Sequence, residues 1–324
     1  MSPLTEVSGY IADRLHQLPQ AEDLALLFPG QGSQKAGMGK DIAAISPVAR
    51  DVFKVADATL GESLSRLCFE GPDDELTRTA NAQPAILATS IAHLVAALEA
   101  GALTSRPACA AGHSLGEYSA LVAAGSLDFR DALSLVRERG LLMEEAGAEG
   151  GTMAAIVAVD EETVREICRL AGVELANLNS ESQFVIGGEG TAVERACQLA
   201  KERGGRGLPI QVSGAFHTSL IASAADRFAA VVDKVAMRDP EVPVLSNVAA
   251  QPMHTAVEVR DDLQRQIRSP VLWQQSIEAM RRSGVTTFVE IGGRVLTAML
   301  KRSYPEASAH ALDCATALAS PTNV

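Results

Sequence analysis

Apolar runs alternate with amphipathic segments through the first half of the chain. A short, unbroken apolar run that ends at Pro29-Gly30 is typical of a buried strand leading into a loop. Longer segments rich in Ala and Leu, one of which stops at Gly101, indicate buried helices. Strands that alternate with helices predict a parallel sheet flanked by helices. The predicted elements are strand 24–28, helix 84–101, strand 108–111, helix 117–124 and helix 129–146.

The pattern changes after Gly150-Gly151, where shorter elements follow in the order strand, helix, strand, strand, helix, strand. This order is the signature of a split βαβ, or ferredoxin-like, unit. We therefore expect a large α/β subdomain interrupted by an inserted ferredoxin-like small subdomain. The predicted elements of the insert are strand 153–159, helix 161–171, strand 173–179, strand 183–187, helix 191–203 and strand 208–212.

Around these two units we expect an N-terminal extension and a short tail. The apolar residues of the extension fit an amphipathic helix that packs on the body of the protein; they are Val7, Tyr10, Ile11, Leu15 and Leu18. The tail is expected to fray from about Ala315. The predicted division is an extension at 1–21, the large subdomain at 22–148 and 213–316, the small subdomain at 149–212 and a tail at 317–324.

Composition and charge restrict the class of protein. Hydrophobic residues make up 47% of the 324 residues and charged residues 21%, as in ordinary globular enzymes. No apolar run approaches the roughly 18 residues of a membrane span, and Glu6 and Asp13 argue against a secretory signal. The net charge of −12 argues against nucleic acid as a partner. Five scattered cysteines without a C-x-x-C pattern suit buried thiols in the cytoplasm and predict neither disulfides nor a metal site.

The segment Gly112-His113-Ser114-Leu115-Gly116 is the main candidate for chemistry. A G-x-S-x-G between a strand and a helix is a nucleophile elbow, whose glycines allow a tight turn that exposes the serine. The hydroxyl of Ser114 then lies at a helix N-terminus, where free N–H groups favour developing negative charge.

A serine hydroxyl needs a base, and the chain has six histidines. His217 follows a predicted strand at a boundary, and it remains after the others are set aside by their positions. The residues alone leave open whether His217 is the base or an ordinary surface histidine. The others are His16 in the extension, His93 inside a helix, His113 on the elbow turn itself, His254 in a polar loop and His310 near the tail.

The stretch GHSLGEYSAL at 112–121, together with FPGQGSQ at 28–34, resembles the malonyl-CoA:acyl carrier protein transacylase family. Further motifs follow in the order of that family, and the resemblance runs from about residue 24 to about residue 303. These motifs are Gln83-Pro84-Ala85, Val136-Arg137-Glu138-Arg139-Gly140 with Met143, residues 151–155, Asn179-Ser180 with Gln183, Gly214-Ala215-Phe216-His217, residues 266–273 and residues 289–292.

The resemblance implies that the large subdomain is α/β-hydrolase-like and that His217 is the catalytic base. In the family a backbone carbonyl, here that of Gln266, orients the imidazole, so Ser114 and His217 form a dyad without an acid. The oxyanion hole takes the N–H of Leu115, which the elbow geometry also suggests, and the N–H of Gln31.

The resemblance also implies how the acyl group is recognised. Arg139 matches the family arginine that pairs with the free carboxylate of a malonyl group. Arg137 lies about 200° away around the same helix and is expected to face elsewhere. Phe216 resembles the malonyl-selective form of its motif, because its ring would crowd an α-methyl group. The other residues expected at the acyl pocket are Gln83, His113, Met143 and Asn179.

The expected reaction is a ping-pong transfer of malonyl from malonyl-CoA to Ser114, and then to the phosphopantetheine thiol of an acyl carrier protein, in fatty-acid or polyketide synthesis. We expect a cytoplasmic monomer without metal, cofactor, nucleic-acid or membrane partner. The alternatives are the malonyltransferase subunit of a malonate decarboxylase, a serine thioesterase or esterase, and a scaffold that binds carrier proteins without catalysis. Arg139 argues against a general esterase, which would not bury a cation at the acyl end.

Acyl carrier proteins are typically acidic, so an enzyme with a net charge of −12 would repel its partner at long range. Docking then needs a local basic patch. The candidates are Lys201 with Arg203 and Arg206, and the pair Arg281-Arg282, either of which could equally be a solvated face.

Overall fold

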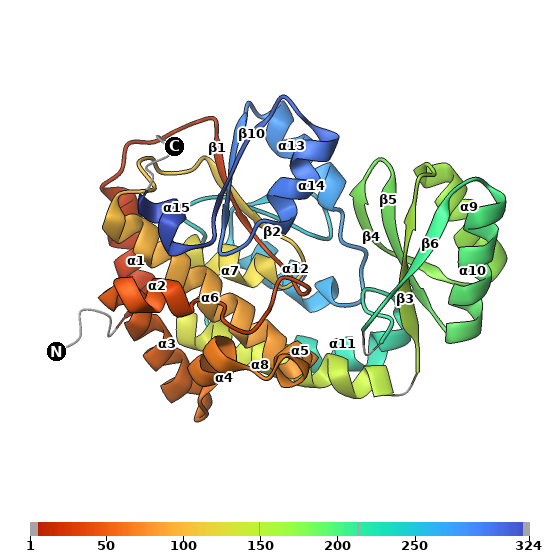
Figure 1. Cartoon of the computed structure of the whole chain (residues 1–324), viewed down its shortest axis with the longest axis horizontal. Coiled ribbons are helices and arrows are strands. Elements are labelled where there is room, and N and C mark those ends of the chain that lie inside the picture. Colours follow the sequence, from red (N-terminus) through yellow and green to blue (C-terminus); the bar gives the residue numbers. More distant parts are fainter. Residues whose placement is uncertain (1–5, 149, 213, 320–324) are drawn as a thin grey trace.

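The computed structural model describes residues 6–148, 150–212 and 214–319, which form two sheets with helices around them (Figure 1). The larger sheet has the order β10-β9-β1-β2-β7-β8, and every pairing in it is parallel except that of β7 with β8. Its strands are β1 (Leu24–Phe28), β2 (Cys109–Gly112), β7 (Val244–Leu245), β8 (Pro252–Met253), β9 (Thr287–Ile291) and β10 (Ser308–Leu312).

The larger sheet is the middle of three layers, because the side chains of its central strand are buried on both faces. In β1, Leu24, Leu26 and Phe28 pack into the main core with α6, whereas Ala25 and Leu27 pack against α13 and α14. The helices of this part are α1 (Val7–His16), α2 (Lys40–Ile45), α3 (Pro47–Leu60), α4 (Leu64–Glu70), α5 (Asp73–Thr77), α6 (Thr79–Ala100), α7 (Gly116–Ala123), α8 (Phe129–Ala148), α11 (Ala222–Val232), α12 (Ala256–Gln266), α13 (Trp273–Arg282), α14 (Val295–Ser303) and α15 (Ala315–Ala319), with a 3₁₀ turn η1 (Ser219–Ile221).

The smaller sheet is antiparallel, with the order β4-β5-β3-β6. Its elements follow the chain as β3 (Thr152–Val157), α9 (Glu161–Ala171), β4 (Glu174–Ser180), β5 (Gln183–Gly188), α10 (Gly190–Glu202) and β6 (Arg206–Ile210). This confirms the expected α/β fold with a ferredoxin-like insert. The domain boundaries stay a prediction, and those at 149 and 213 fall outside the described residues.

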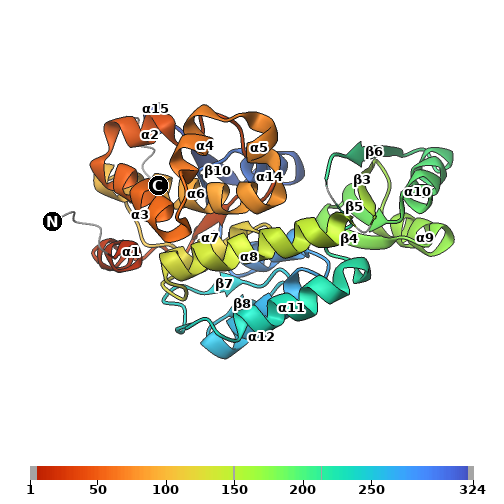
Figure 2. The ribbon, with the colours of Figure 1, turned by 90° about the horizontal axis from the view of Figure 1, so that it is seen from below.

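The two sheets are joined by main-chain hydrogen bonds and by a long helix. Leu178 N–H donates to Val271 O at 2.9 Å, and Val271 N–H donates to Ala176 O at 2.9 Å, so β4 is bonded to the loop before α13. On the other side, α8 runs beside α11 toward the smaller sheet (Figure 2). The two sheets are therefore held in place by contacts on both sides.

Helix α6 corrects one expectation from the sequence. Its 22 residues include a window with a mean hydropathy of 1.2, so by length and composition alone it could cross a membrane. The expectation that no apolar run approaches this length is therefore wrong. Because 94% of that window is buried inside the fold, α6 is the central helix of a protein core.

The N-terminal extension forms α1, whose Val7, Ile11 and Leu15 are buried in the main core as predicted. Ser8 Oγ also accepts a hydrogen bond of 2.9 Å from the N–H of Phe129, at the start of α8. At the other end, α15 occupies part of the tail that was expected to fray, and its Leu318 is buried. The remainder of the predicted tail, 320–324, lies outside the described residues.

Candidate active site

Ser114 lies at a sharp turn between β2 and α7, with a φ of 50°. Both flanking glycines are required by close packing: a Cβ on Gly112 would lie 1.9 Å from the carbonyl carbon of Gly116, and one on Gly116 would lie 2.1 Å from the oxygen of Phe28. The serine therefore sits on the strand–turn–helix that a nucleophile elbow requires.

His217 faces the serine across the turn, and its Nε2 lies 2.8 Å from Ser114 Oγ. Its Nδ1 lies 3.0 Å from the carbonyl oxygen of Gln266 and 3.1 Å from that of Ser269. Because both of these oxygens can only accept, Nδ1 carries the proton and Nε2 is left free to accept the serine proton. The Ser269 carbonyl is a second orienting group that the sequence did not indicate.

Burial, reinforced by the positive charge of Arg139, lowers the pKa of His217 to about 3. The hydrogen bonds to Gln266 and Ser269 oppose this shift. The imidazole is consequently neutral at physiological pH, which is the form a general base needs.

Arg139 extends from α8 into the same site and is only 1% exposed. Its Nη2 donates to Ser114 Oγ at 3.0 Å and to Gln266 Oε1 at 2.9 Å, and its Nη1 donates to Gln83 Oε1 at 2.9 Å. Among the described residues no carboxylate forms an ion pair with it, and burial lowers the pKa of its guanidinium. A buried cation held only by neutral groups is suited to an anionic ligand.

Arg137, on the same helix, makes different contacts. Its guanidinium pairs with Glu62 and donates to the carbonyl oxygen of Ala80 at 2.7 Å. The two arginines thus serve different faces of α8, as their spacing predicts.

The two backbone donors named for the oxyanion hole lie beside the serine. In the described part of the chain, neither the N–H of Gln31 nor that of Leu115 donates to a protein acceptor. The loop that carries Gln31 packs directly on the elbow, because a Cβ on Gly30 would lie 2.4 Å from the oxygen of His113. Both N–H groups are therefore free to bind a substrate oxygen.

A cavity of about 200 Å³ opens at this point. His113, Met143 and Phe216 line it, as expected for acyl-pocket residues, together with Gln31, Ser114 and His217. Gln83 and Asn179 lie behind the wall: Gln83 contacts Arg139 and the sulfur of Met143, and Asn179 Oδ1 lies 2.9 Å from His113 Nε2. These two residues support the pocket rather than line it.

Two residues at the elbow escaped the sequence reasoning. Asn247 Oδ1 accepts the N–H of Ser114 at 2.7 Å, and Asn247 Nδ2 donates to the oxygen of Gly112 at 2.7 Å. Glu117, on the first turn of α7, accepts the N–H of Asn247 at 2.9 Å and is fully buried. A charged residue within the apolar sequence of α7 was the available signal for Glu117; nothing local marks Asn247.

Known proteins are similar to this chain in sequence and in fold. The family described as the acyl transferase domain matches residues 25–318. The chain belongs to this acyl transferase family. The malonyl CoA-acyl carrier protein transacylase of Bacillus subtilis is 47% identical, over 86% of this chain and 90% of its own. The transacylase of the same name from Escherichia coli is 43% identical, over 91% of this chain and 97% of its own. The family predicted from the motifs is confirmed.

Solved structures agree with the sequence comparison. A type II polyketide malonyl-transacylase, solved in complex with its acyl carrier protein, superposes on this acyl transferase with a TM-score of 0.89 at 40% identity, covering 93% of this chain and 99% of that one. An acyl carrier protein S-malonyltransferase from Vibrio cholerae gives a TM-score of 0.88 at 40% identity, covering 92% and 99%.

Proposed function

We propose that this acyl transferase moves a malonyl group from malonyl-CoA to the phosphopantetheine thiol of an acyl carrier protein, in fatty-acid or polyketide synthesis. The relatives at 43–47% identity carry the name of this activity. The observation that carries the choice of acyl group is Arg139, whose Nη2 lies 3.0 Å from Ser114 Oγ without a carboxylate partner among the described residues. A malonyl carboxylate would supply that anion.

In the first half-reaction, Ser114 Oγ attacks the thioester carbonyl while His217 Nε2 takes its proton. The N–H groups of Gln31 and Leu115 stabilise the oxyanion of the tetrahedral intermediate. When the intermediate collapses, His217 returns the proton to the departing thiol of CoA, and a malonyl ester remains on Ser114.

In the second half-reaction, the carrier-protein thiol enters the same cavity and loses its proton to His217. The resulting thiolate attacks the ester carbonyl, and the serine oxygen recovers the proton as it leaves. The same donors act in both directions, and both thiols bear the same pantetheine arm. Two substrates can therefore use one site in turn.

Selection among acyl groups follows from two side chains. Arg139 favours acyl groups with a free carboxylate over neutral ones, because removing the anion leaves a buried cation unpaired. Phe216, which lies at the cavity wall and is 5% exposed, leaves little room for an α-methyl group. One methyl group accounts for only about 1–3 kcal/mol, so we expect modest discrimination against methylmalonyl-CoA.

Of the two basic patches, the one formed by Lys201, Arg203 and Arg206, called the β6 patch below, is better suited to dock an acidic carrier protein. Arg281 pairs with Glu306 and lies over the ring of Tyr304, while Arg282 lies 3.7 Å from Glu278. Lys201 and Arg206, in contrast, are exposed and form no ion pair with any described residue.

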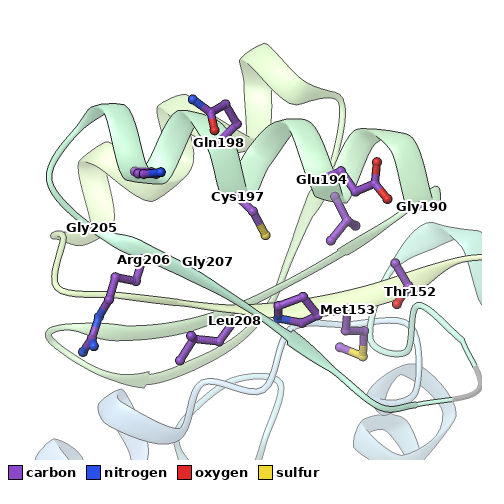
Figure 3. A pocket seen from close by; sticks show the side chains of 13 residues that line it. Thr152, Met153, Gly190, Glu194, Cys197, Gln198, Gly205, Arg206, Gly207 and Leu208 are labelled. Atoms are coloured by element: carbon purple, nitrogen blue, oxygen red, sulfur yellow. The ribbon is translucent and has the colours of Figure 1, made fainter.

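The position of Arg206 supports this choice. It opens β6, whose last residue, Ile210, lines the catalytic cavity. Arg206 and Leu208 point away from α10 and Cys197, on the opposite side of the strand (Figure 3). A larger groove of about 640 Å³ lies between β6 and α10; none of the proposed catalytic residues lines it, but Met153 lines both this groove and the catalytic cavity. Arg206 thus lies on the strand that leads to the active site, while Lys201 lies near it at the end of α10.

Further inferences concern the setting of the reaction. The site is complete within one chain, which supports a monomer as the working unit. The described cysteines are all free thiols, as suits the cytoplasm. The two substrates supply the thioester and the thiol, so the reaction requires no cofactor.

The test is intact-mass analysis after the protein is mixed with malonyl-CoA, acetyl-CoA or methylmalonyl-CoA. We expect a malonyl adduct that is absent in Ser114→Ala. We also expect Arg139→Ala to lose malonyl loading and gain acetyl loading, because the unpaired buried cation is gone. Equal loading of malonyl and acetyl groups by the wild-type protein would contradict the proposal.

A further inference from the structure

A pair of buried carboxyl groups lies close to the elbow, one on α7 and one on α12, and the reaction steps above do not use it. Glu117 is 0% exposed and Asp262 1% exposed, and no described cation forms an ion pair with either. The two carboxyl groups lie close enough for each to affect the ionisation of the other. Burial raises the pKa of both, and the negative charge of Asp262 raises the pKa of Glu117 further.

The oxygens of Glu117 also accept two hydrogen bonds from residues of the active site. Oε1 accepts the backbone N–H of Asn247 at 2.9 Å. Oε2 accepts from Nε2 of the Gln266 side chain. Glu117 thus connects the elbow helix α7 to the loop after β7 and to the end of α12.

Gln266 contacts all three groups that would perform the transfer. Its main-chain oxygen accepts from His217 Nδ1 at 3.0 Å, and its side-chain Oε1 accepts from Arg139 Nη2 at 2.9 Å. Its side-chain Nε2 donates to the main-chain oxygen of Ser114 at 3.0 Å. The amide must keep its oxygen toward Arg139, since a flipped amide would place N–H groups against the guanidinium. Oε2 of Glu117 and the main-chain oxygen of Ser114 together fix this orientation, because only the nitrogen end of Gln266 can donate to them.

Asn247 has a comparable role at the serine. Its side chain bonds to Ser114 N–H on one side of the turn and to Gly112 O on the other. These bonds stabilise a residue with a φ of 50°, in a region that non-glycine residues rarely adopt. Glu117 holds the main chain of Asn247 in place for these contacts.

We propose that Glu117 is a positioning residue for the transfer reaction: through Gln266 it sets the orientation of Arg139, and through Asn247 it supports the turn that carries Ser114. This inference rests on the proposed function of Arg139 as the malonyl-binding group. It predicts that Glu117 affects the choice of acyl group although it does not touch the substrate.

The test is Glu117→Gln, which keeps the shape of the side chain. The new amide nitrogen cannot accept from Gln266, so Gln266 Nε2 loses one of its two acceptors and keeps only the main-chain oxygen of Ser114. The orientation of the Gln266 amide toward Arg139 is then less firmly fixed. We expect the ratio of kcat/KM for malonyl-CoA to that for acetyl-CoA to fall about tenfold or more. General damage to the fold would lower both values together and leave the ratio unchanged. Circular dichroism and the melting temperature report whether the variant is folded.

Ser119→Ala is the matched control, because Ser119 is also buried on α7 but its hydroxyl has no hydrogen-bond partner in the described structure. It should keep the wild-type ratio. In Gln266→Met, which keeps the main-chain carbonyl, the ratio should fall as well, and Glu117→Gln should add little to that loss in the double variant.

An unchanged ratio in folded Glu117→Gln would overturn this inference. If Glu117→Gln does not fold, an unchanged ratio in Gln266→Met would overturn it instead. A wild-type protein that fails to load malonyl at all would contradict the proposed function, and the two failures are therefore distinguishable.

Discussion

The residue that most distinguishes this site from that of a simple serine hydrolase is a cation. Arg139 donates to the hydroxyl of Ser114, the proposed nucleophile, and His217 has backbone carbonyls where a triad would place a carboxylate. Burial and the charge of Arg139 favour neutral imidazole in the free enzyme, and the neutral carbonyls stabilise its charged form less than a carboxylate would. A bound malonyl carboxylate would neutralise Arg139 and so remove one of the causes that lower the pKa of His217.

This predicts an unusual pH profile. Because the pKa of His217 is lowered to about 3 from an ordinary value of 6.5, the base stays neutral in mildly acidic solution. We expect kcat/KM for malonyl-CoA to remain flat from pH 8 to about pH 5, with no inflection from His217 near 6.5. The contribution of His217 to stability should be present above pH 6.5 and decline as the pH falls toward 3, because the unfolded chain binds the proton first.

Steady-state kinetics in a constant-ionic-strength buffer series would measure the profile. Arg139→Ala, assayed with acetyl-CoA, serves as the comparison, because loss of the positive charge should move the acid limb to higher pH. A wild-type midpoint between pH 6 and 7 would mean that the imidazole is solvated, contrary to its burial in the structure.

How far the sequence predicts individual residues depends on whether their signal is local. Ser114, Arg139 and His217 lie in recognisable motifs, and the structure brings them together. Asn247 and the Ser269 carbonyl have no local mark, because they act only through partners 133 and 52 residues away along the chain. Backbone carbonyls carry no side-chain identity, so a sequence cannot single them out.

At the scale of elements, helix α6 shows a similar limit. The Ala- and Leu-rich stretch that stops at Gly101 predicts a helix from about residue 84. The helix instead begins at Thr79 and continues through Pro84. Proline cannot donate to the carbonyl oxygen of Ala80, but Arg137 from α8 donates to it at 2.7 Å. A side chain from another helix thus supplies the hydrogen bond that Pro84 cannot make, and α6 continues through the proline.

The elbow depends on the packing of α7 against β1, and a substitution of Gly116 tests this packing. A Cβ at this position would lie 2.1 Å from Phe28 O and 2.9 Å from Pro29 O, so the backbone must shift. We expect Gly116→Ala to lower the free energy of unfolding by about 1–3 kcal/mol and to reduce malonyl loading, since the loop to Gln31 moves with Phe28. Denaturant unfolding and single-turnover loading measure the two effects.

Gly190→Ala provides the control, because an added Cβ there meets no atom within 4 Å. It should unfold at nearly the wild-type denaturant concentration. If Gly116→Ala also unfolds at nearly the wild-type denaturant concentration, the close approach of the elbow to β1 is not required for stability.

For the whole molecule, the notable property is the contrast between a net charge of −12 and an acidic partner. We expect Lys201→Glu combined with Arg206→Glu to raise the KM for the carrier protein by about tenfold at low salt, because the local attraction becomes repulsion. Loading from malonyl-CoA, the first half-reaction, should stay near the wild-type rate. The difference between variant and wild type should shrink as salt is added.

Arg281→Glu is the corresponding change in the other patch and should leave the KM for the carrier protein nearly unchanged. A larger effect from Arg281→Glu than from the β6 variants would place docking at the opposite patch. Separate assays of the two half-reactions distinguish weaker docking from damaged chemistry.

The main-chain bonds between β4 and Val271 have a consequence for how the acyl group is selected. They attach the smaller sheet to the loop that follows Ser269, whose carbonyl orients the imidazole. Swinging the two halves apart or together would break those bonds and disturb the base. We therefore expect substrate discrimination to take place in a preformed cavity, by fit and charge, without an induced-fit closure of one half upon the other.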